Sequence, residues 1–180
     1  LCAKDSPSQP APRPLRDYFQ ICRERDMLWL CLFYSFTFGG FVGLASFLVI
    51  FFHDQYGLTK VMAGNFTALC VFAGSFLRPI GGYLADRFGG TRMLTLLFLG
   101  ASLAMAAVSS LPPLWVATTL LFLIMAILGL GNGSVFQLVP QRFQREIGVA
   151  TGVVGAAGGL GGFLLPAFMG WCKDVAGSYG

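Results

Sequence analysis

Five long runs of apolar residues divide the 180-residue chain, and this pattern limits the possible folds more than any other feature. The runs cover about 27–52, 61–85, 93–111, 114–139 and 147–171, each near the roughly 20 residues that a helix needs to cross a bilayer. Backbone amides in lipid must bond to one another, so each run is predicted to be helical. Only 11% of the residues are charged, whereas soluble domains carry about 25%. The chain is therefore predicted to be an all-α membrane protein in contact with the lipid bilayer.

The positions of the basic residues predict the orientation of these helices. Nine of the 12 Lys and Arg residues lie before the first run or in the gaps after the second and fourth runs. Only Lys60 and Lys173 lie on the opposite side, so the N-terminus is expected in the cytoplasm and the C-terminus outside. Residues 1–26, rich in Pro and basic groups, are predicted to be a cytoplasmic linker and lead-in to a transmembrane unit at 27–180. Nearly all of the basic residues that give the net charge of +4 lie in the short segments beside the apolar runs. This charge therefore does not indicate a nucleic-acid partner.

A permanent charge, Arg78, lies inside the second run. At 1.5 Å per helical residue, it is about 12 Å from Asp86 and about 27 Å from Lys60, which places it well within the hydrocarbon. Such a charge costs roughly 2.5–3.5 kcal/mol on insertion scales, and no Asp or Glu lies within the five runs. An intramembrane charge indicates a functional site. The alternative is a structural arginine bonded to carbonyls or to an acid from elsewhere.

The chemistry of Arg78 predicts the class of ligand. Its guanidinium group is planar and presents its donors in a fork, which matches a small planar oxyanion through parallel hydrogen bonds. Pro79 follows directly and lacks an amide hydrogen, so the carbonyl of Ser75 loses its helical partner beside the charge. The second run is therefore predicted to hold an anion site.

Glycine is unusually dense in the fifth run. Each interior Gly costs about 1 kcal/mol against Ala in helix propensity, and small residues four apart let helix backbones approach closely. The run is predicted to serve contact, motion or ligand approach, with plain tight packing as the alternative. The fourth run adds Asn132 between Gly131 and Gly133, an amide inside the membrane. The pairs with this spacing are Gly148/Gly152, Gly155/Gly159 and Gly158/Gly162.

The gap after the second run carries small and charged residues at fixed spacing: Gly82, Asp86, Arg87, Gly89 and Arg92. It is predicted to be a tight turn in which glycine permits positive φ, and Asp86 accepts from helix N-terminal amides or pairs with arginine. The pattern resembles the G-x3-D-R-x-G-x-x-R loop of the major facilitator superfamily, on the cytoplasmic side of each six-helix half. The resemblance implies two such halves. This chain would be the C-terminal half with spans 7 to 11, truncated before the last helix. An ordinary charged turn is the alternative.

Several stretches together resemble the nitrate/nitrite porter family of that superfamily. The family has a glycine-rich signature and a membrane-embedded arginine in each half, and Arg78 stands where the second-half arginine is expected. Residues 151–166 (TGVVGAAGGLGGFLLP) are similar to the second-half signature, and 128–140 (LGLGNGSVFQLVP) to the helix before it. Residues 34–47 resemble the seventh helix, where an aromatic pair four residues apart brackets the anion. Tyr34 and Phe38 have this spacing and share a helix face.

The family resemblance implies a nitrate/nitrite transporter that works by alternating access in the cell inner membrane. The missing half would supply a second arginine, and no metal or cofactor is implied. Because the runs contain no acid, anion exchange is favoured over proton symport. The chain has Gly155 and Gly159 where the family has Ser or Ala, so a hydroxyl contact to the ion is not implied. The implied substrate-binding residues are Arg78, Tyr34, Phe38, Asn132, Gly155, Gly158 and Gly159. The implied packing and rocking residues are Gly148, Gly152, Gly161 and Gly162.

Two other classes of function stay open. A major facilitator for another small anion or an organic acid would keep Arg78 without requiring a planar ligand. A membrane sensor or anchor on a transporter fold would bind a ligand without moving it. The sequence contains no Ser/His/Asp set, metal-ligand spacing or phosphate loop, so an enzyme is not expected.

Overall fold

The computed structural model describes residues 21–177, which form helices joined by short turns. Within this part of the chain, five helices are long and apolar enough to cross a membrane, which confirms the predicted class. Residues 1–20 of the predicted linker lie outside the described residues. The first membrane-length helix comprises α2 (Arg25–Tyr34), the π-helical turn η1 (Ser35–Gly39) and α3 (Gly40–Tyr56). The others are α4 (Lys60–Phe88), α5 (Gly90–Ser109), α6 (Leu114–Arg142) and α7 (Ile147–Ala176).

Most helices extend beyond the predicted runs, because polar residues at a membrane interface continue a helix without disturbing its apolar part. The third run was predicted to end at 111, but α5 ends at Ser109. Leu111 has a φ of 48° and stands before two prolines, and the residue before a proline is disfavoured in the α conformation. Pro140 was predicted to close the fourth helix, yet α6 continues to Arg142. Pro140 therefore lies inside the last turn of α6 and is not its final residue.

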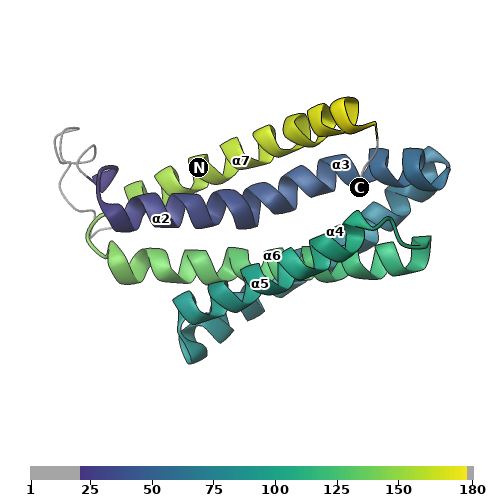
Figure 1. The fold of residues 1–180 in the computed structure, drawn as a ribbon. Helices are drawn as coiled ribbons and strands as arrows, with labels where there is room; N and C mark the ends of the chain where they lie inside the picture. Colours follow the sequence, from purple (N-terminus) through teal and green to yellow (C-terminus); the bar gives the residue numbers. More distant parts are fainter. Residues whose placement is uncertain (1–20, 178–180) are drawn as a thin grey trace, which may run out of the picture.

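The helix α6 forms the centre of the bundle. In Figure 1, α7 runs beside the α2–α3 helix, and α6 lies between this pair and α5, while α4 packs against both α6 and α3. Ion pairs join the helices at their ends: Asp26 with Arg142 at 3.4 Å, and Asp54 with Lys173 at 2.5 Å. The first pair is largely solvent-exposed and the second is partly exposed, and exposed pairs contribute little stability. Apolar packing therefore holds the bundle together.

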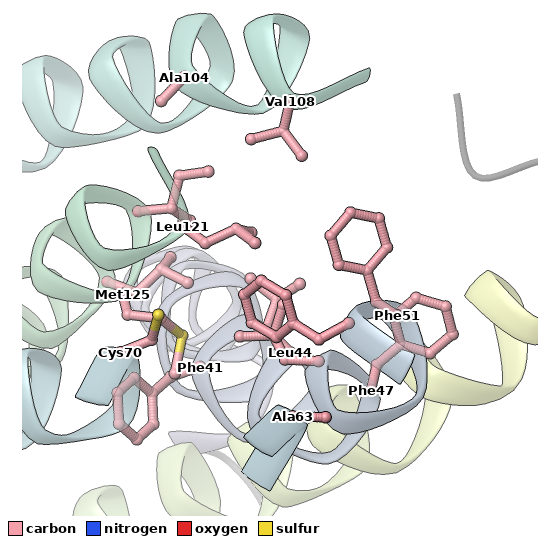
Figure 2. Packing of buried hydrophobic residues seen from close by; sticks show 14 residues of the cluster. Phe41, Leu44, Phe47, Phe51, Ala63, Cys70, Ala104, Val108, Leu121 and Met125 are labelled. Carbon is pink, nitrogen blue, oxygen red and sulfur yellow. The ribbon is translucent and has the colours of Figure 1, made fainter. Parts of the chain in front are cut away.

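Two clusters of buried apolar side chains divide the bundle along its length. One cluster lies around α3, where Phe41 and Leu44 gather with Cys70 of α4 and Met125 of α6 in Figure 2. The other lies around α2 and includes Met27 and Tyr34. The π-helical turn η1 connects the two clusters, so its side chains lie midway along the first long helix.

Glycines let the backbones of α4 and α6 touch. A Cβ atom added to Gly129 would lie 2.0 Å from the carbonyl oxygen of Gly74, and one added to Gly133 would lie 1.9 Å from the carbonyl oxygen of Arg78. Real Cβ atoms do not approach carbonyl oxygens so closely, so only glycine allows this crossing. The crossing fixes the backbone of Arg78 against α6.

The charged loop motif forms a very short connection between α4 and α5. Gly89, with a φ of 90°, separates the two helices and confirms the positive φ predicted there, whereas Gly90, where it was also expected, is the first residue of α5. Gly82 and Asp86 lie in α4 and Arg92 lies in α5, while Arg87 packs over the ring of Phe88. Asp86 accepts a hydrogen bond from the side-chain amide of Gln137 on α6, a partner that was not among those expected. The loop motif is therefore tied to α6 by a polar side chain.

Candidate functional site

Arg78 lies in the middle of α4 and is partly buried. The guanidinium carbon is 4.8 Å from the centre of the Phe41 ring and 5.4 Å from the centre of the Phe38 ring. Ring faces attract a cation at such distances, but they accept none of its directed N–H bonds. The buried Nε of Arg78 has no hydrogen-bond partner within residues 21–177, and no ion pair of Arg78 is present there. The charge is held by aromatic rings, and its hydrogen-bond donors remain available for a ligand.

The aromatic pair predicted from the sequence stands beside Arg78. The rings of Tyr34 and Phe38 stack with centres 5.0 Å apart and planes only 4° apart. The ring of Phe136, on α6, meets Tyr34 edge-on at 4.8 Å. The predicted shared face of Tyr34 and Phe38 is thus confirmed, and these rings form an apolar wall next to the charge.

Glycine on α7 makes room for this aromatic pair. A Cβ atom added to Gly158 would lie 2.5 Å from the ring of Tyr34 and 3.0 Å from the ring of Phe38. One turn on, a Cβ atom at Gly161 would lie 2.6 Å from the carbonyl oxygen of Ser35, whose hydroxyl donates to the carbonyl of Ala157 at 2.9 Å. The contact between α7 and η1 therefore depends on glycine, and it brings Gly158 into the group formed by Arg78 and the aromatic pair.

Of the remaining predicted glycines on α7, one lies against a neighbouring helix of the described chain and four do not. Gly162 faces Val42, where an added Cβ atom would lie 3.2 Å away. Within the described residues, no atom lies within 4 Å of a Cβ added at four other positions, so their predicted roles in binding or rocking stay predictions. These four positions are Gly148, Gly152, Gly155 and Gly159.

Asn132 is buried in α6, with 3% of its surface exposed. Neither atom of its side-chain amide has a hydrogen-bond partner within residues 21–177. Buried polar groups in proteins are nearly always paired, so an unpaired amide needs an explanation. The structure thus keeps Asn132 as a candidate site residue.

Two aromatic residues of the site, Phe41 and Phe136, were not predicted from the sequence. Phe41 follows Phe38 by three residues, and Phe136 follows Asn132 by four, so each shares a helix face with a predicted residue. This spacing was the available signal, but it becomes informative only once the neighbouring helices are known.

The chemistry of the group favours an anion over a metal. No cluster of three or more His, Cys, Asp or Glu side chains that could hold a metal ion occurs in the described part of the chain. The cavity of about 650 Å³ between η1 and α7 has apolar walls, including Phe36, Leu164 and Trp171, and does not include Arg78. The group around Arg78 instead combines a cation, aromatic walls and a glycine helix within a membrane bundle, as expected of a transport protein.

Comparison with known proteins identifies the family. The family model of the Major Facilitator Superfamily matches residues 3–166, and the chain belongs to this family, whose members are transporters and not enzymes. The chain is 38% identical over 159 residues to the "Nitrite extrusion protein" of Bacillus subtilis. The aligned region covers 88% of this chain and 40% of the relative. It is 36% identical over 159 residues to the "Probable nitrate transporter NarT" of Staphylococcus epidermidis (88% of this chain, 41% of the relative). It is 32% identical over 185 residues to the "Probable nitrate/nitrite antiporter NarK1" of Thermus thermophilus (92% and 42%). The chain therefore spans about two fifths of the length of these relatives.

Proposed function

We propose that this chain forms part of a transporter that moves nitrate or nitrite across a membrane, with Arg78 as the residue that binds the anion. The observation that carries the proposal is a membrane-embedded guanidinium group held by Phe38 and Phe41, with no acidic partner in the described part of the chain. A buried charge of this kind favours an anionic ligand. The names of the relatives support nitrate and nitrite as the anions.

The aromatic pair and the glycine helix have complementary roles in this proposal. Tyr34 and Phe38 narrow the site and exclude water, which strengthens the hydrogen bonds between Arg78 and the anion. Gly158 lets α7 pack directly on these rings. Motion of α7 along this contact would open and close the site, in keeping with alternating access between the two sides of the membrane.

The chain is proposed to be the C-terminal half of a transporter in the inner membrane of the cell. Its N-terminus would lie in the cytoplasm. The other half would supply a second arginine on the far side of the anion. No acid lies on the apolar parts of the described helices, so this half offers no proton carrier, which favours exchange of nitrate for nitrite over proton symport.

Uptake into proteoliposomes tests the proposal with the full-length protein. The wild type is expected to take up nitrate and nitrite in preference to chloride and formate. Preference for chloride or an organic acid would indicate a transporter for another anion, and nitrate binding without flux would indicate a sensor.

Arg78→Lys keeps the charge but loses the planar fork, so it is expected to lose most nitrate transport. The matched control is Arg142→Lys, at the exposed end of α6, and it is expected to transport like the wild type. Wild-type affinity and rate in Arg78→Lys would contradict the planar-fork mechanism.

A further inference from the structure

Asn132 differs from the other buried polar residue on the same turn of α6. The hydroxyl of Ser134 is completely buried and lies 2.9 Å from the carbonyl oxygen of Leu130 and 3.2 Å from that of Gly81. The amide of Asn132 is almost as buried, yet its nitrogen and its oxygen both lack partners within residues 21–177. Backbone carbonyls therefore satisfy Ser134 as part of the fold, whereas the described chain leaves Asn132 with a free donor and a free acceptor.

Contacts of neighbouring residues show where Asn132 points. Leu128, Asn132 and Phe136 are four residues apart and form one ridge along α6. At one end of the ridge, Leu128 faces Gly40, and at the other end the ring of Phe136 meets Tyr34. Asn132 lies between them and so faces the segment around η1, which carries Phe38.

The next ridge of α6 faces α4. It contains Gly129 and Gly133, and Gly133 touches the carbonyl of Arg78. Asn132 precedes Gly133 and therefore lies on the side of α6 between η1 and α4. The guanidinium group of Arg78 lies in the same seam, because it packs over Phe38 and Phe41. The helix faces thus place the amide of Asn132 and the Nε of Arg78 on the same seam between three helices, and both are buried and unpaired within residues 21–177.

The hydrogen-bonding groups in this seam are complementary. The Oδ1 atom of Asn132 can accept a hydrogen bond from the Nε of Arg78, which would fix the plane of the guanidinium group. The Nδ2 of Asn132 and the outer nitrogens of Arg78 would then present donors in two directions. An oxyanion offers a separate oxygen atom to each of these sets of donors, whereas a halide offers one centre to both.

We propose that Asn132 is a specificity-determining residue that makes this site select a polyatomic oxyanion over a halide. Its amide nitrogen donates to one oxygen of the anion, and its amide oxygen positions Arg78 for the others. This inference rests on the proposed function, because it assigns a second residue to the same anion site.

The variant Asn132→Leu tests this role in the full-length protein, with thermal unfolding measured against added nitrate and added chloride. The variant removes an unpaired buried amide and keeps a similar volume, so its unfolding midpoint without anion is expected to equal or exceed that of the wild type. Its nitrate affinity is expected to fall at least tenfold, while its chloride affinity changes less than threefold. In the matched control Ser134→Ala, the midpoint is expected to fall and the ratio of nitrate to chloride affinity to stay unchanged.

A lower midpoint in Asn132→Leu with an unchanged affinity ratio would show that Asn132 is structural and overturn the proposal. A parallel loss of nitrate and chloride affinity would also overturn it. If the wild type itself fails to bind nitrate, the proposed function fails as well, so the two failures are distinguishable.

The second variant, Asn132→Asp, keeps the shape and places a carboxylate beside Arg78, where it competes with the anion. It is expected to lose nitrate binding at neutral pH, and wild-type nitrate affinity in this variant would contradict the placement.

Discussion

Replacing Gly133 by alanine tests the backbone contact that holds Arg78 against α6. The added Cβ atom would lie 1.9 Å from the carbonyl oxygen of Arg78 and 2.7 Å from the amide nitrogen of Gly82. Ordinary contacts begin near 3.4 Å, so α4 and α6 would have to separate by more than 1 Å at this point. Both neighbours are backbone atoms, and therefore no side chain can rotate away to relieve the clash.

The expected effect on stability is the balance of two terms. Overpacking costs typically about 1–3 kcal/mol, and the better helix propensity of alanine offsets about 1 kcal/mol of this. The free energy of unfolding is therefore expected to fall by up to about 2 kcal/mol. The effect on transport is expected to be larger, because a displacement of about 1 Å in a positioned group costs on the order of 100-fold in rate.

Nitrate uptake per inserted protein and the unfolding midpoint are the two measurements for Gly133→Ala. The matched control is Gly64→Ala on α4, where no atom of residues 21–177 lies within 4 Å of the added Cβ. The control is expected to transport normally and to be as stable as the wild type or slightly more stable. Wild-type uptake and an unchanged midpoint in Gly133→Ala would show that the two backbones are not in contact, and would refute this account of how Arg78 is positioned.

Two further predictions concern α7 and the orientation of the chain. Gly158→Leu and Gly162→Leu are expected to abolish transport while the protein still inserts, because the larger side chains push α7 away from η1. In the control Gly170→Leu no described atom is near, and transport is expected to persist. Normal flux in either variant would mean that its glycine faces lipid. A tag in 53–59 is expected to react with an impermeant label on whole cells, and a tag at 88–90 only after permeabilisation, whereas the reverse pattern would discard the proposed orientation.

The membrane helices could be predicted from the sequence because the bilayer sets their length. Each long apolar run became a helix, and most errors lie at the ends, where the interface tolerates polar residues. Leu111 shows the limit of hydropathy, since it is apolar and yet lies beyond α5 with a positive φ. The proline that follows disfavours a helical conformation at this residue, whatever its affinity for lipid.

The site was only partly predictable, because a periodic pattern gives the face of a helix and not its neighbour. The four-residue spacing of Tyr34 and Phe38 correctly predicted stacked rings. Phe41 and Phe136 join the site only through the packing of η1 against α4 and α6, about which the sequence says nothing directly. The glycine run on α7 predicted close contact, but only one face of a helix can touch a neighbour. Contacts therefore occur at Gly158 and not at Gly159.

The π-helical turn between Ser35 and Gly39 gives the first long helix one residue more than a regular α-helix of the same length would hold. The helical segments on either side keep their own phase, so α2 and α3 each present a continuous apolar face to the bundle. Loss of one residue from this turn would leave both faces packed as they are, but with one side chain fewer near Arg78. The wider turn therefore lets α2 and α3 keep their packing faces, while η1 itself brings Phe38 toward Arg78 and Ser35 onto α7.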